Sequence, residues 1–164
     1  MISLPVQYLI YGNGVFPGSA LPVLYYEQAL KIPAIFPAHS IKSLFQKTGW
    51  TNNWTSGIYT YHHYHSNTHE VMAAISGQSI LILGGENGIK IFFRKGDVLV
   101  IPAGVAHKNL GDEKDVKCVG GYPFGKDFDM NYGHSGERPR ADENLQNVPF
   151  PPGGPIYGPT DPLL

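Results

Sequence analysis

The chain carries little charge and few basic residues. Charged residues make up only 15% of its 164 residues, below the roughly one quarter that is typical of soluble proteins, and the formal net charge is -1. Three arginines and no basic run are present, so the clustered cations that nucleic-acid binding requires are missing. We therefore expect no nucleic-acid partner.

Cysteine and long apolar segments are scarce as well. Cys118 is the only cysteine, which excludes an intramolecular disulfide and is compatible with a reducing compartment. No apolar run approaches the roughly 20 residues that a membrane-spanning helix needs. Residues 1–6 lack the basic and apolar segments of a signal peptide. We therefore expect a cytoplasmic protein with no membrane partner.

Turn residues, in contrast, are abundant. Twenty glycines and fourteen prolines divide the chain into short segments, and between residues 57 and 122 six of these segments have strand character. The expected strands are Ile58–His65, Glu70–Ile75, Ser79–Leu83, Lys90–Phe93, Asp97–Ile101 and Val116–Tyr122. No helix-length segment separates neighbouring strands, which indicates an all-β, antiparallel sandwich or barrel.

The whole chain is expected to form one domain, because its length is sufficient for a single sizeable core. Residues 1–50 should contribute N-terminal strands and a short helix, and residues 51–122 the barrel core. Residues 123–164 are rich in Pro and Gly, with helical character only at Ala141–Gln146. This last segment is expected to wrap around the barrel.

The N-terminal part contains apolar segments with two different periodicities. Val6–Tyr11 and Leu21–Tyr26 are expected to be strands, and Pro37–Lys47 a helix, since its apolar residues follow i, i+3, i+4 spacing. The two apolar strands are suited to covering a sheet edge or pairing with a second copy of the chain, so we predict a homodimer.

Histidines are concentrated in one place. Four of the seven lie within residues 62–69, directly before Glu70. Alternate side chains of a strand share a face, so His63 and His65 should point the same way. With Glu70 they make three candidate metal ligands, and His107 is the candidate fourth. Imidazole nitrogen and carboxylate oxygen suit one divalent transition metal such as Fe, Mn, Ni or Zn. Four such ligands leave open coordination positions for a small-molecule substrate, water or O2.

These segments resemble the two signature motifs of the cupin superfamily. The first motif, with its glycines, His-x-His pair and glutamate, is matched by Gly57, His63, His65, Glu70 and Gly77. The second is matched by Gly96, Pro102, Gly104 and His107, whereas its final Asn corresponds to Gly111. The chain is also similar to a group of small, functionally undefined bacterial single-domain cupins. The resemblance implies a cupin-type barrel, also called a double-stranded β-helix or jelly roll, and a bound metal, but no particular substrate.

His69 is the alternative metal ligand, because a shift of one residue in strand register would exchange it for Glu70. The spacing from Glu70 to Gly77 agrees with the cupin motif and favours Glu70.

Strand parity also suggests residues around the metal. Tyr59 and Tyr61 share the parity of the histidine pair, and they either pack as core aromatics or use their hydroxyls to orient substrate or donate protons. They are the candidate catalytic residues. Met72 and Asn109 are candidate substrate-binding residues by the same argument.

Three functions agree with this pattern. The favoured one is a metal-dependent enzyme of dioxygenase or oxidoreductase type that acts on a small organic substrate. The second is a non-redox isomerase of sugars or keto acids, in which the metal polarises a carbonyl. The third is a small-molecule binding or sensor module without turnover.

Overall fold

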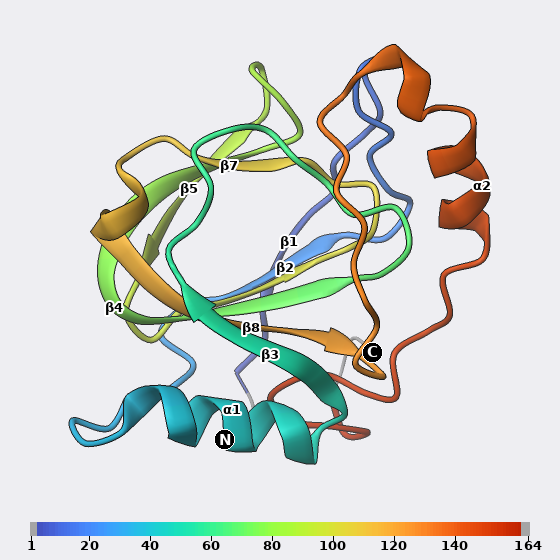
Figure 1. Cartoon of the computed structure of the whole chain (residues 1–164). Coiled ribbons are helices and arrows are strands. Elements are labelled where there is room, and N and C mark those ends of the chain that lie inside the picture. The colour runs from blue at the N-terminus through green and yellow to red at the C-terminus, as the bar shows by residue number, and fades with distance from the viewer. Residues whose placement is uncertain (1–2, 162–164) are drawn as a thin grey trace.

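A computed structural model describes residues 3–161 and shows mainly antiparallel strands (Figure 1). The strands are β1 (Val6–Tyr8), β2 (Val23–Tyr26), β3 (Trp50–Ser56), β4 (Glu70–Leu83), β5 (Ile89–Arg94), β6 (Val98–Ile101), β7 (His107–Asn109) and β8 (Val116–Pro123). The helices are α1 (Pro37–Lys47) and α2 (Arg140–Gln146), with 3-10 turns at Glu113–Asp115 and Ser135–Glu137. Neither α-helix of the described residues is long and apolar enough to cross a membrane.

The strand order is β1-β2-β6-β4-β8-β3, and β5 and β7 pair with β4 outside this path. Strand β4 connects the two groups, because its first half pairs with β6 and β8 and its second half with β5 and β7. All pairings are antiparallel, and the sheet is jelly-roll-like without closing completely. The predicted all-β, cupin-type antiparallel architecture is therefore confirmed.

The prediction that Glu70–Ile75 and Ser79–Leu83 are separate strands is wrong. They form the single strand β4, which bends at a register shift between Ala74 and Ser76. Gly77 has a positive φ of 74°, and a Cβ there would lie 2.0 Å from the carbonyl oxygen of Asp115. Glycine is therefore needed at this bend, which redirects the strand without reversing it.

The predicted strand Ile58–His65 is also not formed. Strand β3 ends at Ser56, and the following segment makes only isolated bridges, between His63 and His107 and between Tyr64 and Asn131. Successive residues of this segment hydrogen-bond to different parts of the chain, so no continuous ladder develops. Its partner, the short strand β7, was not predicted.

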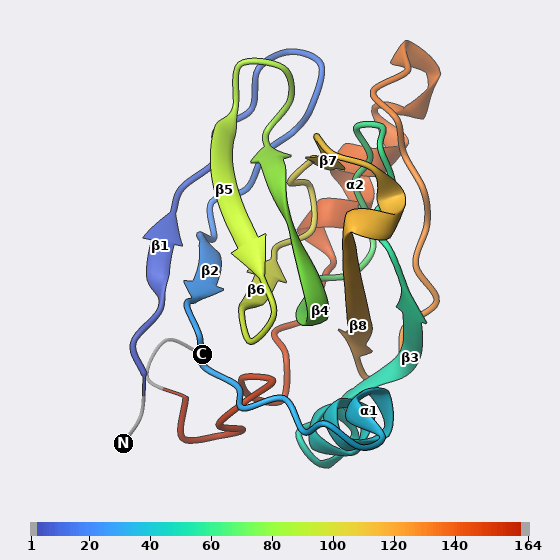
Figure 2. The ribbon, with the colours of Figure 1, turned by 90° about the vertical axis from the view of Figure 1, so that its left-hand side faces the viewer.

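The helix Pro37–Lys47 was predicted with its observed bounds. Ile41 and Phe45 are buried, and they pack with Trp50, Tyr26 and other apolar residues against one face of the sheet. Figures 1 and 2 show α1 lying across the end of β3 and β8. A second apolar cluster, which includes Met72, fills the space between the two halves of the fold.

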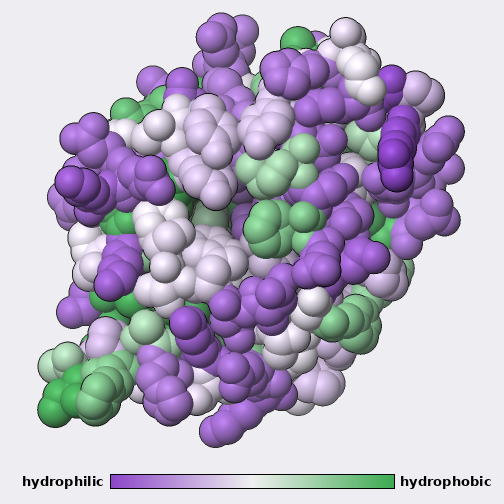
Figure 3. All heavy atoms as spheres, in the orientation of Figure 1, coloured by the Kyte–Doolittle hydropathy of each residue, from purple (hydrophilic) through white to green (hydrophobic). Residues whose placement is uncertain are grey.

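The C-terminal segment runs along the outside of the strands (Figure 2). The Trp50 indole nitrogen donates to the carbonyl oxygen of Gly153 at 2.9 Å, and the Tyr26 hydroxyl donates to the Asp161 carboxylate at 2.8 Å. In Figure 3, drawn in the orientation of Figure 1, hydrophilic residues gather toward the rim of the visible face and less hydrophilic ones around its centre.

Candidate metal centre

Three buried histidines converge inside the sheet. They are His63 and His65, which lie in the loop after β3, and His107, which belongs to β7. Each of the three places one ring nitrogen within 4.8 Å of the others. The two backbone hydrogen bonds between His63 and His107, at 3.2 and 2.9 Å, fix the loop against β7. A buried cluster of three imidazoles is able to hold a metal ion.

The hydrogen bonds of the three rings determine which nitrogen is free. Each Nδ1 lies within hydrogen-bond distance of a backbone carbonyl oxygen, which accepts only, so each Nδ1 must carry a proton in the neutral ring. For His63, His65 and His107 these oxygens belong to Tyr61 at 3.0 Å, Asp129 at 2.6 Å and Val105 at 3.1 Å. The three Nε2 atoms are left with lone pairs for a ligand, which is the arrangement typical of metal-binding histidines.

Glu70, the first residue of β4, directs its carboxylate toward the same point. Oε1 lies 3.2 Å from Nε2 of His107, and Oε2 lies 3.4 Å from Nε2 of His65. Tyr122 donates its hydroxyl to Oε2 at 2.9 Å. Among the described residues, Oε1 of Glu70 and the Nε2 atoms of His65 and His107 are buried without a hydrogen-bond partner. These donor atoms fit a metal ion.

The buried charges interact strongly. Burial opposes ionisation of Glu70, but His65 and His107 together hold the pKa of its carboxyl well below the usual range. Burial also opposes protonation of His65, yet the Glu70 carboxylate and nearby hydrogen bonds raise the pKa of this imidazole. Burial and the neighbouring His107 lower the pKa of His63 to about 3. Glu70 is therefore a carboxylate and His63 a neutral imidazole near neutral pH.

A cavity of about 250 Å³ opens onto this cluster. Tyr59 and Met72 line it, together with Phe128. Tyr61 does not line it, but stacks on Tyr59 with the ring centroids 4.9 Å apart.

The other sequence candidates lie elsewhere. Asn109 is buried and outside the cavity; its side-chain oxygen accepts from the Ser79 hydroxyl at 2.5 Å and from the Gly111 amide at 2.9 Å. It therefore supports the turn after β7. His69 lies outside the histidine cluster, and its Nδ1 accepts a hydrogen bond from the Ala103 amide at 2.9 Å.

Tyr122 and Trp54 were not among the residues predicted for the site. The Trp54 indole donates to the Tyr122 hydroxyl at 2.8 Å, so the indole, the phenol and the Glu70 carboxylate form a chain. A Cβ at Gly120 would lie 2.0 Å from the Trp54 ring, which means that the indole requires glycine there. The pair Gly120-Gly121 inside strand β8 was the available signal for this packing. Glycine within a strand often marks a place where another group approaches the backbone closely.

Comparisons with known proteins agree with the architecture. A family model described as "Cupin domain" matches residues 55–119, which include all three histidines of the cluster. The Bacillus subtilis (strain 168) protein named "Uncharacterized protein YjlB" is 39% identical over 143 residues, spanning 87% of this chain and 84% of its own length.

Two solved structures show more distant likeness. Acireductone dioxygenase from Bacillus anthracis, with a cadmium ion in its active center, aligns with 61% of this chain and 77% of its own, at 16% identity and a TM-score of 0.41. Recombinant pro-11S globulin of pumpkin aligns with 47% of this chain and 20% of its own, at 21% identity and a TM-score of 0.38.

Proposed function

The chain belongs to the cupin family, and on that premise we propose that it is a metal-dependent enzyme of dioxygenase or oxidoreductase type that acts on a small organic substrate. The observation that supports this proposal is the set of buried donor atoms without hydrogen-bond partners on His65, Glu70 and His107. Leaving a buried polar atom unpaired costs about 1–3 kcal/mol. A bound ion would remove that cost for all three atoms together.

In this proposal His63, His65, Glu70 and His107 hold one divalent ion of Fe, Mn, Ni or Zn. An ion of the Fe(II) type would supply Lewis acidity and electron transfer for oxidation by O2. Tyr122 occupies Oε2 of Glu70, so Oε1 is the oxygen left to act as a ligand.

The cavity indicates the size and polarity of the substrate. Its volume of about 250 Å³ is below the roughly 300–1,000 Å³ of most ligand pockets, which favours a small molecule. Met72 and Phe128 supply apolar walls that limit the access of water, and Tyr59 stands at the wall with a hydroxyl that can orient a substrate.

The lining also bears on the reaction class. Among the described residues, no lysine or arginine lines the cavity, and Glu70 is its only carboxylate. An isomerase of keto acids requires a group that binds the substrate carboxylate, and this lining offers no cationic side chain for it. Tyr59 can move a proton in either reaction class, so the lining disfavours keto-acid isomerisation but not sugar isomerisation.

Anaerobic reconstitution tests the proposal without knowledge of the substrate. The metal-free protein is loaded under argon with Fe(II), and nitric oxide, a surrogate for O2, is titrated while the EPR spectrum is recorded. We expect one iron per chain and an iron-nitrosyl signal. His107→Ala should lose both, whereas the exposed His134→Ala should retain both. Iron binding without a nitrosyl signal would contradict an O2-dependent function. If the signal is present, O2 uptake is then measured with a panel of small substrates.

We also propose a homodimer. Strand β1 lies at one end of the strand order and pairs only with β2 among the described strands, so its outer edge is available to a second copy. Val6 is 46% exposed and Leu4 73% exposed beside this edge. Sedimentation should give twice the chain mass of 18.0 kDa, and a single species at the chain mass would contradict the proposal.

A further inference from the structure

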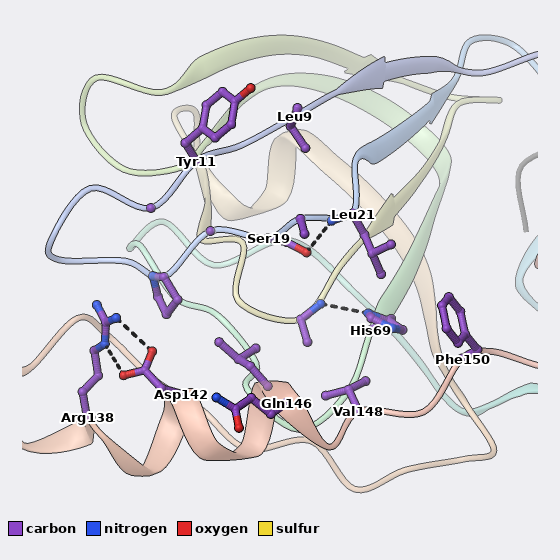
Figure 4. Close-up of a pocket in the computed structure, with 16 residues that line it drawn as sticks. Leu9, Tyr11, Ser19, Leu21, His69, Arg138, Asp142, Gln146, Val148 and Phe150 are labelled. Atoms are coloured by element: carbon purple, nitrogen blue, oxygen red, sulfur yellow. Dashed lines mark hydrogen bonds and ion pairs between the residues drawn. The ribbon is translucent and has the colours of Figure 1, made fainter.

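A second cavity, of about 750 Å³, lies between residues 9–21 and residues 138–150 (Figure 4). It shares no lining residue with the cavity of the metal centre. Its volume falls within the roughly 300–1,000 Å³ of cavities that bind small molecules.

His69 provides a hydrogen-bond donor in this cavity. Its side chain is almost completely buried, with a relative exposure of 7%. The Ala103 amide donates to its Nδ1, as the dashed line in Figure 4 shows, so the ring is neutral and its proton is on Nε2. No acceptor for this Nε2–H is found among the described residues. The atom is not among the fully buried side-chain atoms, so it is reachable from the cavity, and a ligand oxygen can replace water as its acceptor.

His69 borders more than one cavity. His69 also lines two neighbouring cavities, of about 350 and 310 Å³. The first of these shares Leu21 and Phe150 with the large cavity, and the second shares Val148. His69 therefore lies where three adjoining cavities meet.

The rest of the lining is mainly apolar and carries no uncompensated charge. Leu145, Val148 and Phe150 contribute apolar side chains from the C-terminal segment. Arg138 makes two hydrogen bonds of 2.8 Å to the Asp142 carboxylate, so these opposite charges neutralise each other. Phe150 is 78% exposed at the cavity, and Leu9, Tyr11 and Leu21 of the same lining are exposed as well, so the cavity presents several exposed apolar side chains together.

We propose that this cavity binds an uncharged, largely apolar small molecule that carries a carbonyl oxygen, and that Nε2–H of His69 donates to that oxygen. The apolar walls accommodate the body of the molecule. The His69 donor, reachable from the cavity, selects for the acceptor. The site is separate from the metal centre and does not depend on its function.

Two aromatic probes of nearly equal shape test the proposal. 2-Acetylnaphthalene carries the carbonyl acceptor, and 2-isopropylnaphthalene lacks it. Binding to the metal-loaded wild-type protein is followed by probe fluorescence. One net hydrogen bond predicts a preference of about threefold to tenfold for the ketone. His69→Phe removes the donor and should bring the two affinities within about twofold of each other, whereas the exposed His39→Phe should leave the preference unchanged.

A cavity-filling variant tests the location independently. Gln146 is exposed and lines the cavity from α2, so Gln146→Trp should weaken both probes without touching His69. Unchanged metal content would show that the variants are folded. The proposal is overturned if wild-type protein binds neither probe, if His69→Phe keeps the ketone preference, or if Gln146→Trp binds both probes as tightly as wild type. A wild-type dimer that binds neither probe and dissociates in Phe150→Asp would assign the cavity to a second copy of the chain.

Discussion

The hydrogen bond from the Tyr122 hydroxyl to Glu70 allows a direct test of the proposed role of Glu70 as a metal ligand. Tyr122 is 1% exposed, donates to Oε2 of Glu70 at 2.9 Å and accepts from the Trp54 indole at 2.8 Å. In Tyr122→Phe the buried carboxylate loses a hydrogen bond to a charged group, worth about 1.5–3 kcal/mol. The half-buried indole loses its acceptor, which adds about 1 kcal/mol. We therefore expect the free energy of unfolding of the metal-free protein to fall by about 3 kcal/mol.

Metal affinity should change as well, because the substitution frees Glu70 to rotate away from the three Nε2 atoms. Loss of a partner that orients a metal ligand costs about 10–100-fold in affinity, and we expect a decrease of that size. Urea unfolding of the metal-free protein gives the stability, and competition with a chromophoric chelator gives the affinity for Zn²⁺, which avoids redox side reactions.

Tyr26→Phe is a matched control, since Tyr26 is also fully buried and donates to a buried carboxylate, that of Asp161, at 2.8 Å. It should lower stability by about 2 kcal/mol and leave Zn²⁺ affinity unchanged. Equal Zn²⁺ affinities of wild type and Tyr122→Phe would refute the argument that Tyr122 orients Glu70 as a ligand.

Three further predictions concern the same region. Glu70→Gln keeps the shape of the side chain but removes its charge, so Zn²⁺ affinity should fall by about 10–100-fold. The metal-free protein should also lose stability in urea unfolding, because His65 loses its buried counter-charge; a wild-type Zn²⁺ affinity would exclude Glu70 as a ligand. Gly120→Ala places a Cβ against the Trp54 ring and should lower the free energy of unfolding by about 1–3 kcal/mol, and a change below measurement error would contradict this packing. Burial lowers the pKa of His69 to about 4, so its neutral form stabilises the fold fully above pH 6.5, and up to about 3 kcal/mol is lost as pH falls from 6.5 toward 4. Urea unfolding between pH 4 and 7 should show a smaller loss of unfolding free energy in His69→Phe than in wild type. Parallel pH profiles of the two proteins would contradict a contribution from His69.

The fold was predictable where local pattern and tertiary structure agree. The apolar spacing within Pro37–Lys47 predicted the helix α1, proline suits its first turn, and Gly49, with a φ of 84°, marks its end. The segment Ile58–His65 was misassigned because its alternating aromatic and histidine residues are typical of a strand, whereas its hydrogen bonds go to two different segments. Long-range pairing of this kind leaves no local signal.

The part of the candidate site that depends on the sequence positions of the ligand residues was predictable. Strand parity and the resemblance to the cupin motifs selected the three histidines that the structure brings together. They did not reveal Tyr122, because the contact with Glu70 depends on the registration of β8 beside β4, with Val71 opposite Gly121. Parity places Asn109 on the buried face of β7 together with His107, as observed. It could not show that hydrogen bonds to Ser79 and Gly111 hold the side chain outside the cavity.

Anomalous X-ray diffraction from crystals of the protein, purified without added chelator, tests the central claim most directly. The account predicts one strong anomalous peak per chain, within bonding distance of Nε2 of His63, His65 and His107 and of Oε1 of Glu70. No peak at that position in crystals soaked with Fe(II), Mn(II), Ni(II) or Zn(II), or a peak that Glu70 does not contact, would contradict it.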